Sequence, residues 1–335
     1  MENTIQSSLR VPSRKDVCKT KTGEGPVAAA FRTDEAGLCE RPLSLWETGE
    51  SNGSVSIQTL FDGGHDIGEM NGLSVDELAF AICRGGWQQT VAMTEKFAFD
   101  CAYRHLLGEI CSRMVFLSGI KRGLKRVEAL LRAYAKNLGT QVSVAAIRAD
   151  VLAETQGTFS DSTVKNYMKA LKAISVIEEL PSWKPQLQTQ TAIRTANTRY
   201  FSDPSFAAAA LGIGPQELLE APQTFARVFK NLCIRDLRIY TGALDGHLFH
   251  YRDKTNLECD AVLQRRDGSY GFIEINLGGQ EAIEQMATML QKLAAKIDTS
   301  CMPQPSFLMV LTASGNWAYR RRDGVLVVPV GCLTS

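Results

Sequence analysis

Two carboxylates lie inside apolar runs of the sequence, where acidic side chains are unusual. Asp260 sits within LECDAVLQ and Glu274 within YGFIEINL, and the turn-forming residues 266–269 (RDGS) separate the two runs. Alternating apolar and polar residues around an Asp-Gly pair predict a β-hairpin. A carboxylate among apolar residues is costly unless a cation meets it. Two carboxylates on adjacent strands could share a divalent metal ion, as in many sites that cleave phosphodiester bonds.

The residue two positions after Glu274 bears on whether such a site could work. Metal-dependent nucleases of this kind usually carry a lysine there, and this sequence has Asn276. An amide donates a hydrogen bond but brings no positive charge, and losing one such stabiliser costs roughly 10²–10³ in rate. We therefore interpret Asp260, Glu274 and Asn276 as a degenerate catalytic set, with Asp260 and Glu274 as the candidate metal ligands. No cofactor is expected, apart from Mg²⁺ if the site is functional.

Three lysines recur on one face of a predicted helix. Residues 161–174 read DSTVKNYMKALKAI, in which Lys165, Lys169 and Lys172 follow at intervals of four and three residues. Two predicted helices precede this one and a β-hairpin follows, which is the pattern of a winged helix-turn-helix, whose third helix can enter a DNA major groove. Lysines attract phosphates with little base selectivity, so the pattern predicts weakly sequence-specific binding of double-stranded DNA. The alternative is a solvated lysine face on a small helical domain.

The overall charge conceals an asymmetry along the chain. The 335 residues are 44% hydrophobic and 22% charged with a net charge of +1, which is typical of a globular protein of two or three domains. Residues 40–80 carry eight acids against one arginine, whereas residues 113–173 carry eleven Lys and Arg against four acids. A basic block before a candidate metal site favours a nucleic-acid partner. Two solvated surfaces of opposite sign are the alternative.

Several classes of protein do not fit the sequence. The nine cysteines include no Cys-x-x-Cys pair, so structural zinc is not expected. The first sixteen residues are polar and lack the apolar core of a signal peptide. No uncharged apolar run approaches the ~20 residues that span a bilayer. We therefore predict a cytoplasmic protein with reduced thiols and no membrane partner.

The last third of the chain alternates helical and strand patterns. A helical pattern is followed by three strand patterns, a second helix and an apolar strand: about 225–240, 247–252, 257–264, 270–277, 280–297 and 306–313. The order α-β-β-β-α-β is that of the restriction-endonuclease-like core, in which the second and third strands carry the metal-binding carboxylates. The sequence thus predicts a mixed α/β fold: a helical and winged-helix region followed by this domain.

Seven collinear segments resemble a bacterial and archaeal family of predicted AAA-type ATPases. They are RPLSLWETGESNGSVSIQTLFDG, ELAFAICRGGW, TVKNYMKALKAISVIEELPSW, RYFSDPSFAAAALG, CIRDLRIYTGALDG, HYRDKTNLECDAVL and VLVVPVGCL, spanning about 41–333. Members of the family join an ATPase module to a winged helix and a nuclease-like domain, the domain of unknown function 4143. Residues 1–35 are rich in Ser, Thr, Lys and Gly and show little periodicity, so we expect them to be disordered. Together with the patterns above, the resemblance implies four further parts: a tail remnant of the ATPase module over 36–72, a helical lid-like region over 73–122, a winged helix over 123–203 and a restriction-endonuclease-like domain over 204–335.

Two departures from the family set the functional expectation. The sequence contains no Gly-Lys dipeptide and hence no phosphate-binding loop, so no ATPase activity is expected from this chain. Lys230 stands where the resemblance implies a glutamate, and close to the acids it could replace the metal with an ion pair. We expect a truncated family member that acts as a non-catalytic DNA-binding or interaction module, with a separately encoded ATPase half as a further partner. The alternative is a weak metal-dependent nuclease using Asp260 and Glu274.

Overall fold

The computed structural model confirms the mixed α/β class. It describes residues 41–65, 67–68, 70–93, 97–98, 108, 110, 124–155, 159–189 and 191–335. The predicted disorder of residues 1–35 lies outside these residues, as does most of the lid-like region beyond Met93. No helix in the described part of the chain is both long enough and apolar enough to cross a bilayer.

The described part of the lid-like region begins with a strongly capped helix. Helix α2 spans Val75–Arg84, and helix α3 spans Gln88–Val91. Ser74 caps α2 through the backbone N–H of Glu77, while the Glu77 carboxylate accepts from the Ser74 backbone, which is a complete capping box. Gly85 ends the helix with a φ of 76°, a conformation that favours glycine. The described start of this region is thus helical, as the sequence predicted for 73–122.

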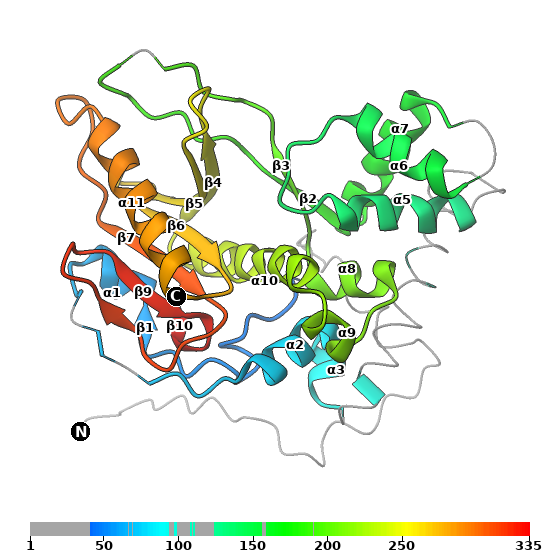
Figure 1. Cartoon of the computed structure of the whole chain (residues 1–335), viewed down its shortest axis with the longest axis horizontal. Coiled ribbons are helices and arrows are strands. Elements are labelled where there is room, and N and C mark those ends of the chain that lie inside the picture. Colours follow the sequence, from blue (N-terminus) through cyan, green and yellow to red (C-terminus); the bar gives the residue numbers. More distant parts are fainter. Residues whose placement is uncertain are drawn as a thin grey trace, which may run out of the picture.

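Three helices and a pair of strands form the predicted winged-helix pattern. The helices are α5 (Leu124–Lys136), α6 (Val144–Glu154) and α7 (Asp161–Ala173), and the strands are β2 (Ile177–Leu180) and β3 (Thr198–Phe201). The two strands pair in antiparallel register. Figure 1 shows these helices as a group set apart from the large sheet.

Two short helices that the sequence analysis did not anticipate follow the strand pair. Helix α8 spans Pro204–Leu211 and helix α9 spans Pro215–Leu219. The signals for α8 are present in the sequence: Asp203 accepts from the Ser205 N–H as N-cap, and a proline occupies the first turn. The run of four alanines in α8 is almost wholly buried.

The C-terminal part contains the predicted order α-β-β-β-α-β. Its elements are α10 (Pro222–Ala243), β4 (Gly246–Arg252), β5 (Glu258–Arg265), β6 (Tyr270–Asn276), α11 (Gln280–Lys296), β7 (Phe307–Thr312), β8 (Tyr319–Arg320), β9 (Leu326–Pro329), a 3₁₀ turn (Val330–Cys332) and β10 (Leu333–Thr334). All of these strands except β10 form one six-stranded sheet in the order β4-β5-β6-β7-β9-β8. Strands β4, β5 and β6 pair antiparallel, and β6, β7 and β9 pair parallel.

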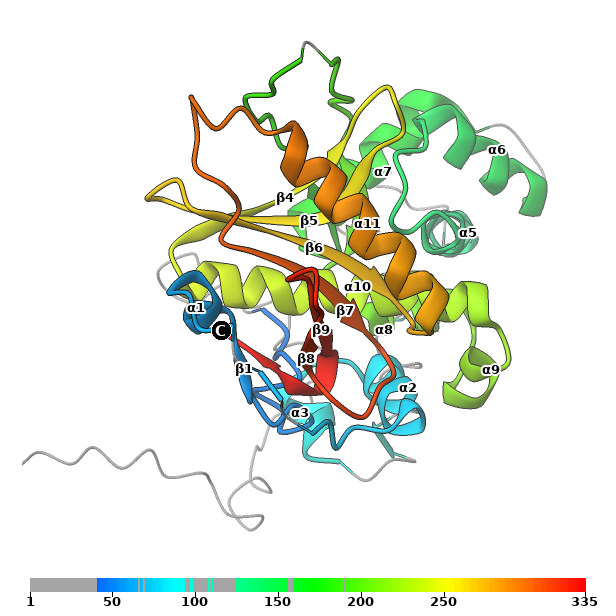
Figure 2. The ribbon, with the colours of Figure 1, turned by 60° about the vertical axis from the view of Figure 1, so that its left-hand side comes forward.

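Helices cover both faces of this sheet. Strand residues such as Ala261 and Ile273 pack in one apolar cluster with α10, while Val262 and Phe272 pack in a second cluster with α11. Figure 2 shows α11 crossing one face and α10 running behind the sheet. This two-sided cover explains why β7 is apolar along its whole length.

The segment before α2 pairs with the end of the chain. Strand β1 (Val55–Ser56) lies parallel to β10, and α1 (Ile57–Phe61) follows it directly. The Ser51 hydroxyl also donates to the carbonyl of Leu333 at 2.7 Å. The pairing of these segments was not part of the sequence prediction.

A buried ionic network connects α10 to the helical region. Arg235 donates to Asp203 at 2.9 Å and to Asp236 at 2.8 Å, and all three side chains are at most 3% exposed. Asp203 also accepts from the N–H of Gly86, and Asp236 accepts from that of Leu45. A β-carbon at Gly86 would collide with the backbone carbonyl oxygen of Leu43. The network therefore holds α8, α10 and two loops in one arrangement.

Candidate functional site

The predicted hairpin brings the two candidate carboxylates together. Strands β5 and β6 pair with Ala261 opposite Ile273, so Asp260 and Glu274 follow as the next opposed pair. The turn agrees with the prediction, since Gly268 adopts a φ of 86° and the Arg265 N–H donates to Ser269 at 2.9 Å. Beyond Ala261 a side chain continues the pairing: Oδ2 of Asp260 accepts from the Ile275 N–H at 3.0 Å.

A bulge in the neighbouring strand pair determines how Asp260 is placed. Strand β4 pairs Phe249 with Val262 but Tyr251 with Cys259, so two residues of β5 stand against one of β4. Such a bulge turns side chains away from simple alternation, and bulges often occur beside functional sites. Cys259 consequently packs in the cluster under α11, while Asp260 meets a side chain from α10.

That side chain is Lys230, whose ammonium group donates to Oδ1 of Asp260 at 2.5 Å. The Lys230 and Asp260 side chains are 27% and 14% exposed. Burial by itself would lower the pKa of Lys230, but the attraction of Asp260 outweighs it and raises this pKa above its usual value. Lys230 is therefore charged, and both Asp260 oxygens already hold a hydrogen-bond donor.

Glu274 is buried and its environment favours the neutral acid. Its residue is 3% exposed, and burial followed by the charge of Asp260 raises its pKa well above 4.5. The Asp260 carboxylate lies close to Glu274 and favours a proton on this carboxyl group. Its Oε1 has no hydrogen-bond partner among the described residues. The positive charge of Lys230 therefore meets this acidic pair at Asp260.

The side chain of Asn276 makes a local contact at the end of β6. Its Oδ1 accepts from the Gly278 N–H at 2.9 Å, which closes a turn at the end of β6. This short local bond is common for asparagine after a strand. The side-chain amide thus shapes the turn after β6.

The space beside Asp260 is small. Strand ends from β3, β4 and β5 enclose a cavity of about 40 Å³ lined by Tyr200, His250 and Cys259 among others. This volume holds a few water molecules at most, well below the ~300 Å³ of a small-molecule pocket. Burial is the main cause that raises the pKa of Tyr200 and Cys259 and lowers the pKa of His250, so all three are neutral. The position of Tyr200 and His250 beside Asp260 was not predicted, because no local pattern in the sequence connects these residues to the hairpin.

The cluster does not fit a divalent cation as it stands. Mg²⁺ binds through carboxylate oxygens that are free and ionised, whereas Asp260 is engaged by two donors and the raised pKa of Glu274 favours its neutral form. Within the residues that the structure describes, no group of three or more His, Cys, Asp or Glu side chains is arranged to hold a metal ion. The ammonium of Lys230 meets the charge that a metal would otherwise neutralise.

The three lysines of α7 have different surroundings. Lys165 and Lys169 are exposed and lie one turn apart, and no ion pair links either to another described residue. Lys172 instead pairs with Glu179 of β2 at 2.7 Å. The basic block is reduced further by internal ion pairs of Arg132, Lys136 and Arg148 with Glu154 and Asp161. On α7, the lysines that remain available to a partner are therefore Lys165 and Lys169.

Two protein-family models match the chain. Residues 75–217 match a domain of unknown function, DUF8612, and residues 225–333 match a second domain of unknown function, DUF4143. The second match confirms the DUF4143 domain that the resemblance implied, and neither match is to an ATPase domain. No curated protein matches the chain. The first match covers the helical region through α8, and the second begins inside α10.

Proposed function

We propose that this chain, with its DUF4143 domain, binds double-stranded DNA without cleaving it, as a non-catalytic module of an AAA-type ATPase system in the cytoplasm. The observation that carries the proposal is the contrast between the two sets of charges. Asp260 is bound by Lys230 at 2.5 Å, whereas Lys165 and Lys169 are exposed on the third helix of a winged-helix pattern. The first set is occupied internally and the second is available to phosphates.

The proposed binding mode is electrostatic and has little sequence preference. Lysine ammonium groups contact phosphates as point charges and carry no base readout of their own. Each phosphate contact contributes about 0.9 to the slope of log affinity against log salt. A contact made by both lysines therefore accounts for a slope of about 1.8, and for roughly tenfold in affinity per lysine near 0.1 M salt.

The test is a salt titration of binding to a fluorescently labelled duplex, followed by anisotropy. Replacing Lys165 and Lys169 together by alanine should weaken binding to unrelated sequences alike and flatten the slope by about 1.8. The control replaces Lys254 and Lys292, two exposed lysines outside the winged helix, and should change the slope less. If the two double variants behave alike, α7 does not face the DNA.

The second candidate is a weak metal-dependent nuclease, and one observation favours it. Oε1 of Glu274 is buried without a hydrogen-bond partner among the described residues, directly beside Asp260. Buried polar atoms of this kind often mark a functional site. Robust Mg²⁺- or Mn²⁺-dependent cleavage by the unmodified chain that disappears in Asp260→Ala would establish this alternative over the first proposal.

A further inference from the structure

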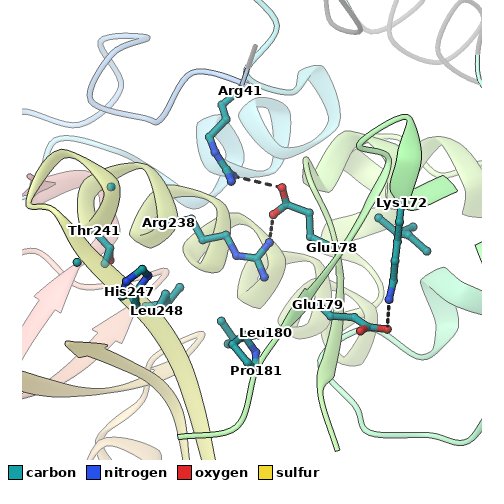
Figure 3. A pocket seen from close by; sticks show the side chains of 13 residues that line it. Arg41, Lys172, Glu178, Glu179, Leu180, Pro181, Arg238, Thr241, His247 and Leu248 are labelled. Carbon is teal, nitrogen blue, oxygen red and sulfur yellow. Dashed lines mark hydrogen bonds and ion pairs between the residues drawn. The ribbon is translucent and has the colours of Figure 1, made fainter. Parts of the chain in front are cut away.

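A cleft of about 560 Å³ opens where strand β2, helix α10 and strand β4 meet (Figure 3). It lies away from the Asp260 cavity, which is lined by other residues. Its volume falls within the ~300–1,000 Å³ that small-molecule sites occupy. The sequence analysis did not predict this cleft, because its walls come from four separate segments of the chain.

One carboxylate serves two guanidinium groups on the wall of the cleft. Glu178 of β2 accepts from Arg41 at 3.2 Å through Oε1 and pairs with Arg238 of α10 through Oε2. Figure 3 shows both arginines reaching toward Glu178 from opposite elements. The second acid of β2, Glu179, is engaged elsewhere by Lys172 at 2.7 Å and Asn197 at 3.0 Å. The two arginines therefore share a single negative charge.

The lack of a second negative charge affects Arg238 more than Arg41. Its side chain is 11% exposed, and its Nη2 is buried with no hydrogen-bond partner among the described residues. Arg41 is 54% exposed and can be hydrated. A mostly buried guanidinium that shares its counter-ion with a second arginine is costly, and a negatively charged ligand in the cleft would supply the missing charge. In Figure 3 the guanidinium of Arg238 extends toward the middle of the cleft, where such a ligand would lie.

Other lining residues offer contacts of another kind. Pro181 and His247 are exposed at the cleft, beside the buried side chains of Leu180 and Leu248. A planar ring can stack on a histidine, as nucleobases do in many protein sites. The charge of the lining is +1, from Arg41, Lys172 and Arg238 against two glutamates. An anionic group at the arginines and a flat group at His247 would together fill the space.

We propose that this cleft binds the phosphate group of a nucleotide-sized ligand through Arg238 and Arg41. The guanidinium groups form charge-assisted hydrogen bonds with phosphate oxygens, the pairing for which arginine is best suited. Glu178 competes with the phosphate for the same donors, so it weakens binding of the ligand. This site contains no glycine-rich loop and does not depend on the proposed contact of α7 with duplex DNA.

Isothermal titration calorimetry of the full chain tests the proposal with three probes: a nucleoside 5′-monophosphate, the same nucleoside and inorganic phosphate. We expect the monophosphate to bind more tightly than phosphate, and the nucleoside to give no saturable signal. Arg41→Ala should weaken monophosphate binding about tenfold or more. Glu178→Gln should strengthen it, because the competing charge is removed while the shape is kept. Lys292→Ala, on the exposed side of α11, removes the same charge as Arg41→Ala and should have little effect.

Arg41→Ala should lower the affinity for the monophosphate, whereas Glu178→Gln should raise it. Unfolding of the variants would not produce these opposite changes, and the Lys292→Ala control accounts for general charge effects. Absence of saturable binding with all three probes up to millimolar concentration would overturn the proposal. Equal losses in Arg41→Ala and Lys292→Ala would also overturn it. Equal affinity for phosphate and the monophosphate would refute the nucleotide-sized ligand. No probe is a duplex, so these results are independent of the test of DNA binding.

Discussion

Replacing Glu274 by glutamine should change how the stability of the protein depends on pH. Glu274 is 3% exposed, and burial followed by the charge of Asp260 raises its pKa well above 4.5, while Lys230 only partly offsets this. The folded protein therefore holds the proton on this carboxyl to a higher pH than the unfolded chain does. The unfolded chain releases it above about pH 4.5. Glutamine has nearly the same shape as the protonated acid.

The sign and size follow from proton linkage. For an acid whose pKa is raised in the folded state, stability falls as pH rises from the unfolded pKa toward the folded one. The slope is about 1.4 kcal/mol per pH unit for one proton. Between pH 5.5 and 7.5, Glu274 should therefore lower the free energy of unfolding by about 2.7 kcal/mol, provided its folded pKa lies above this window. Glutamine does not titrate, so the variant should gain this amount relative to the parent.

Urea unfolding at pH 5.5, 6.5 and 7.5 measures the difference between parent and variant. Trp183 is a suitable reporter, because it is buried and its ring lies 5.0 Å from Tyr270 and 5.4 Å from Phe272 of β6. Other titrating groups cancel in the comparison. The control Glu281→Gln, at an exposed position of α11, should show no such trend. A constant difference across pH would refute the claim that the pKa of Glu274 is raised in the folded state.

Two further variants test the site and the fold. Asn276→Lys alone should leave Mg²⁺- and Mn²⁺-dependent DNA cleavage at background, because Lys230 still forms its ion pair with Asp260. Any cleavage should require the double variant that also carries Lys230→Glu. Cleavage is measured on a supercoiled plasmid. Cleavage by the single variant would show that the ion pair does not block the site. Gly86→Ala should destabilise the protein by about 2 kcal/mol or more, since its β-carbon would meet a backbone carbonyl. Gly72→Ala, where a β-carbon meets nothing within 4 Å, should unfold thermally near the parent temperature.

The sequence predicts the C-terminal part well because its signals are local. The Asp-Gly turn, the alternation in β5 and β6 and the periodicity of α11 each lie within a short stretch, and the structure has them at nearly the predicted bounds. Helix α8 was not predicted, although its N-cap and its proline are local signals of a helix start. The pairing of β1 with β10 joins residues almost 280 positions apart, and no local pattern specifies it.

In the candidate site, too, the features with local sequence signals were predictable and those that depend on tertiary structure were not. The position of Asp260 opposite Glu274 follows from the hairpin, and the sequence suggested Lys230 as a competing cation on a preceding helix. The bulge that turns Asp260 toward α10 was not predictable, because it depends on the pairing of β5 with β4. The cleft at Arg238 requires the tertiary arrangement of four segments, so only the structure could identify it.

The ionic network of Arg235 has a consequence for work on isolated parts of the chain. The two family matches end and begin on either side of residues 218–224, which suggests a convenient place to divide the protein. Arg235 lies in the second part, and Asp203, which it neutralises, lies in the first. A cut there would expose the Arg235 guanidinium to water on one fragment and the Asp203 carboxylate to water on the other. It would also expose the apolar surfaces of α8 and α10 that now pack together. Each fragment should therefore aggregate when expressed alone and regain solubility when both are produced together.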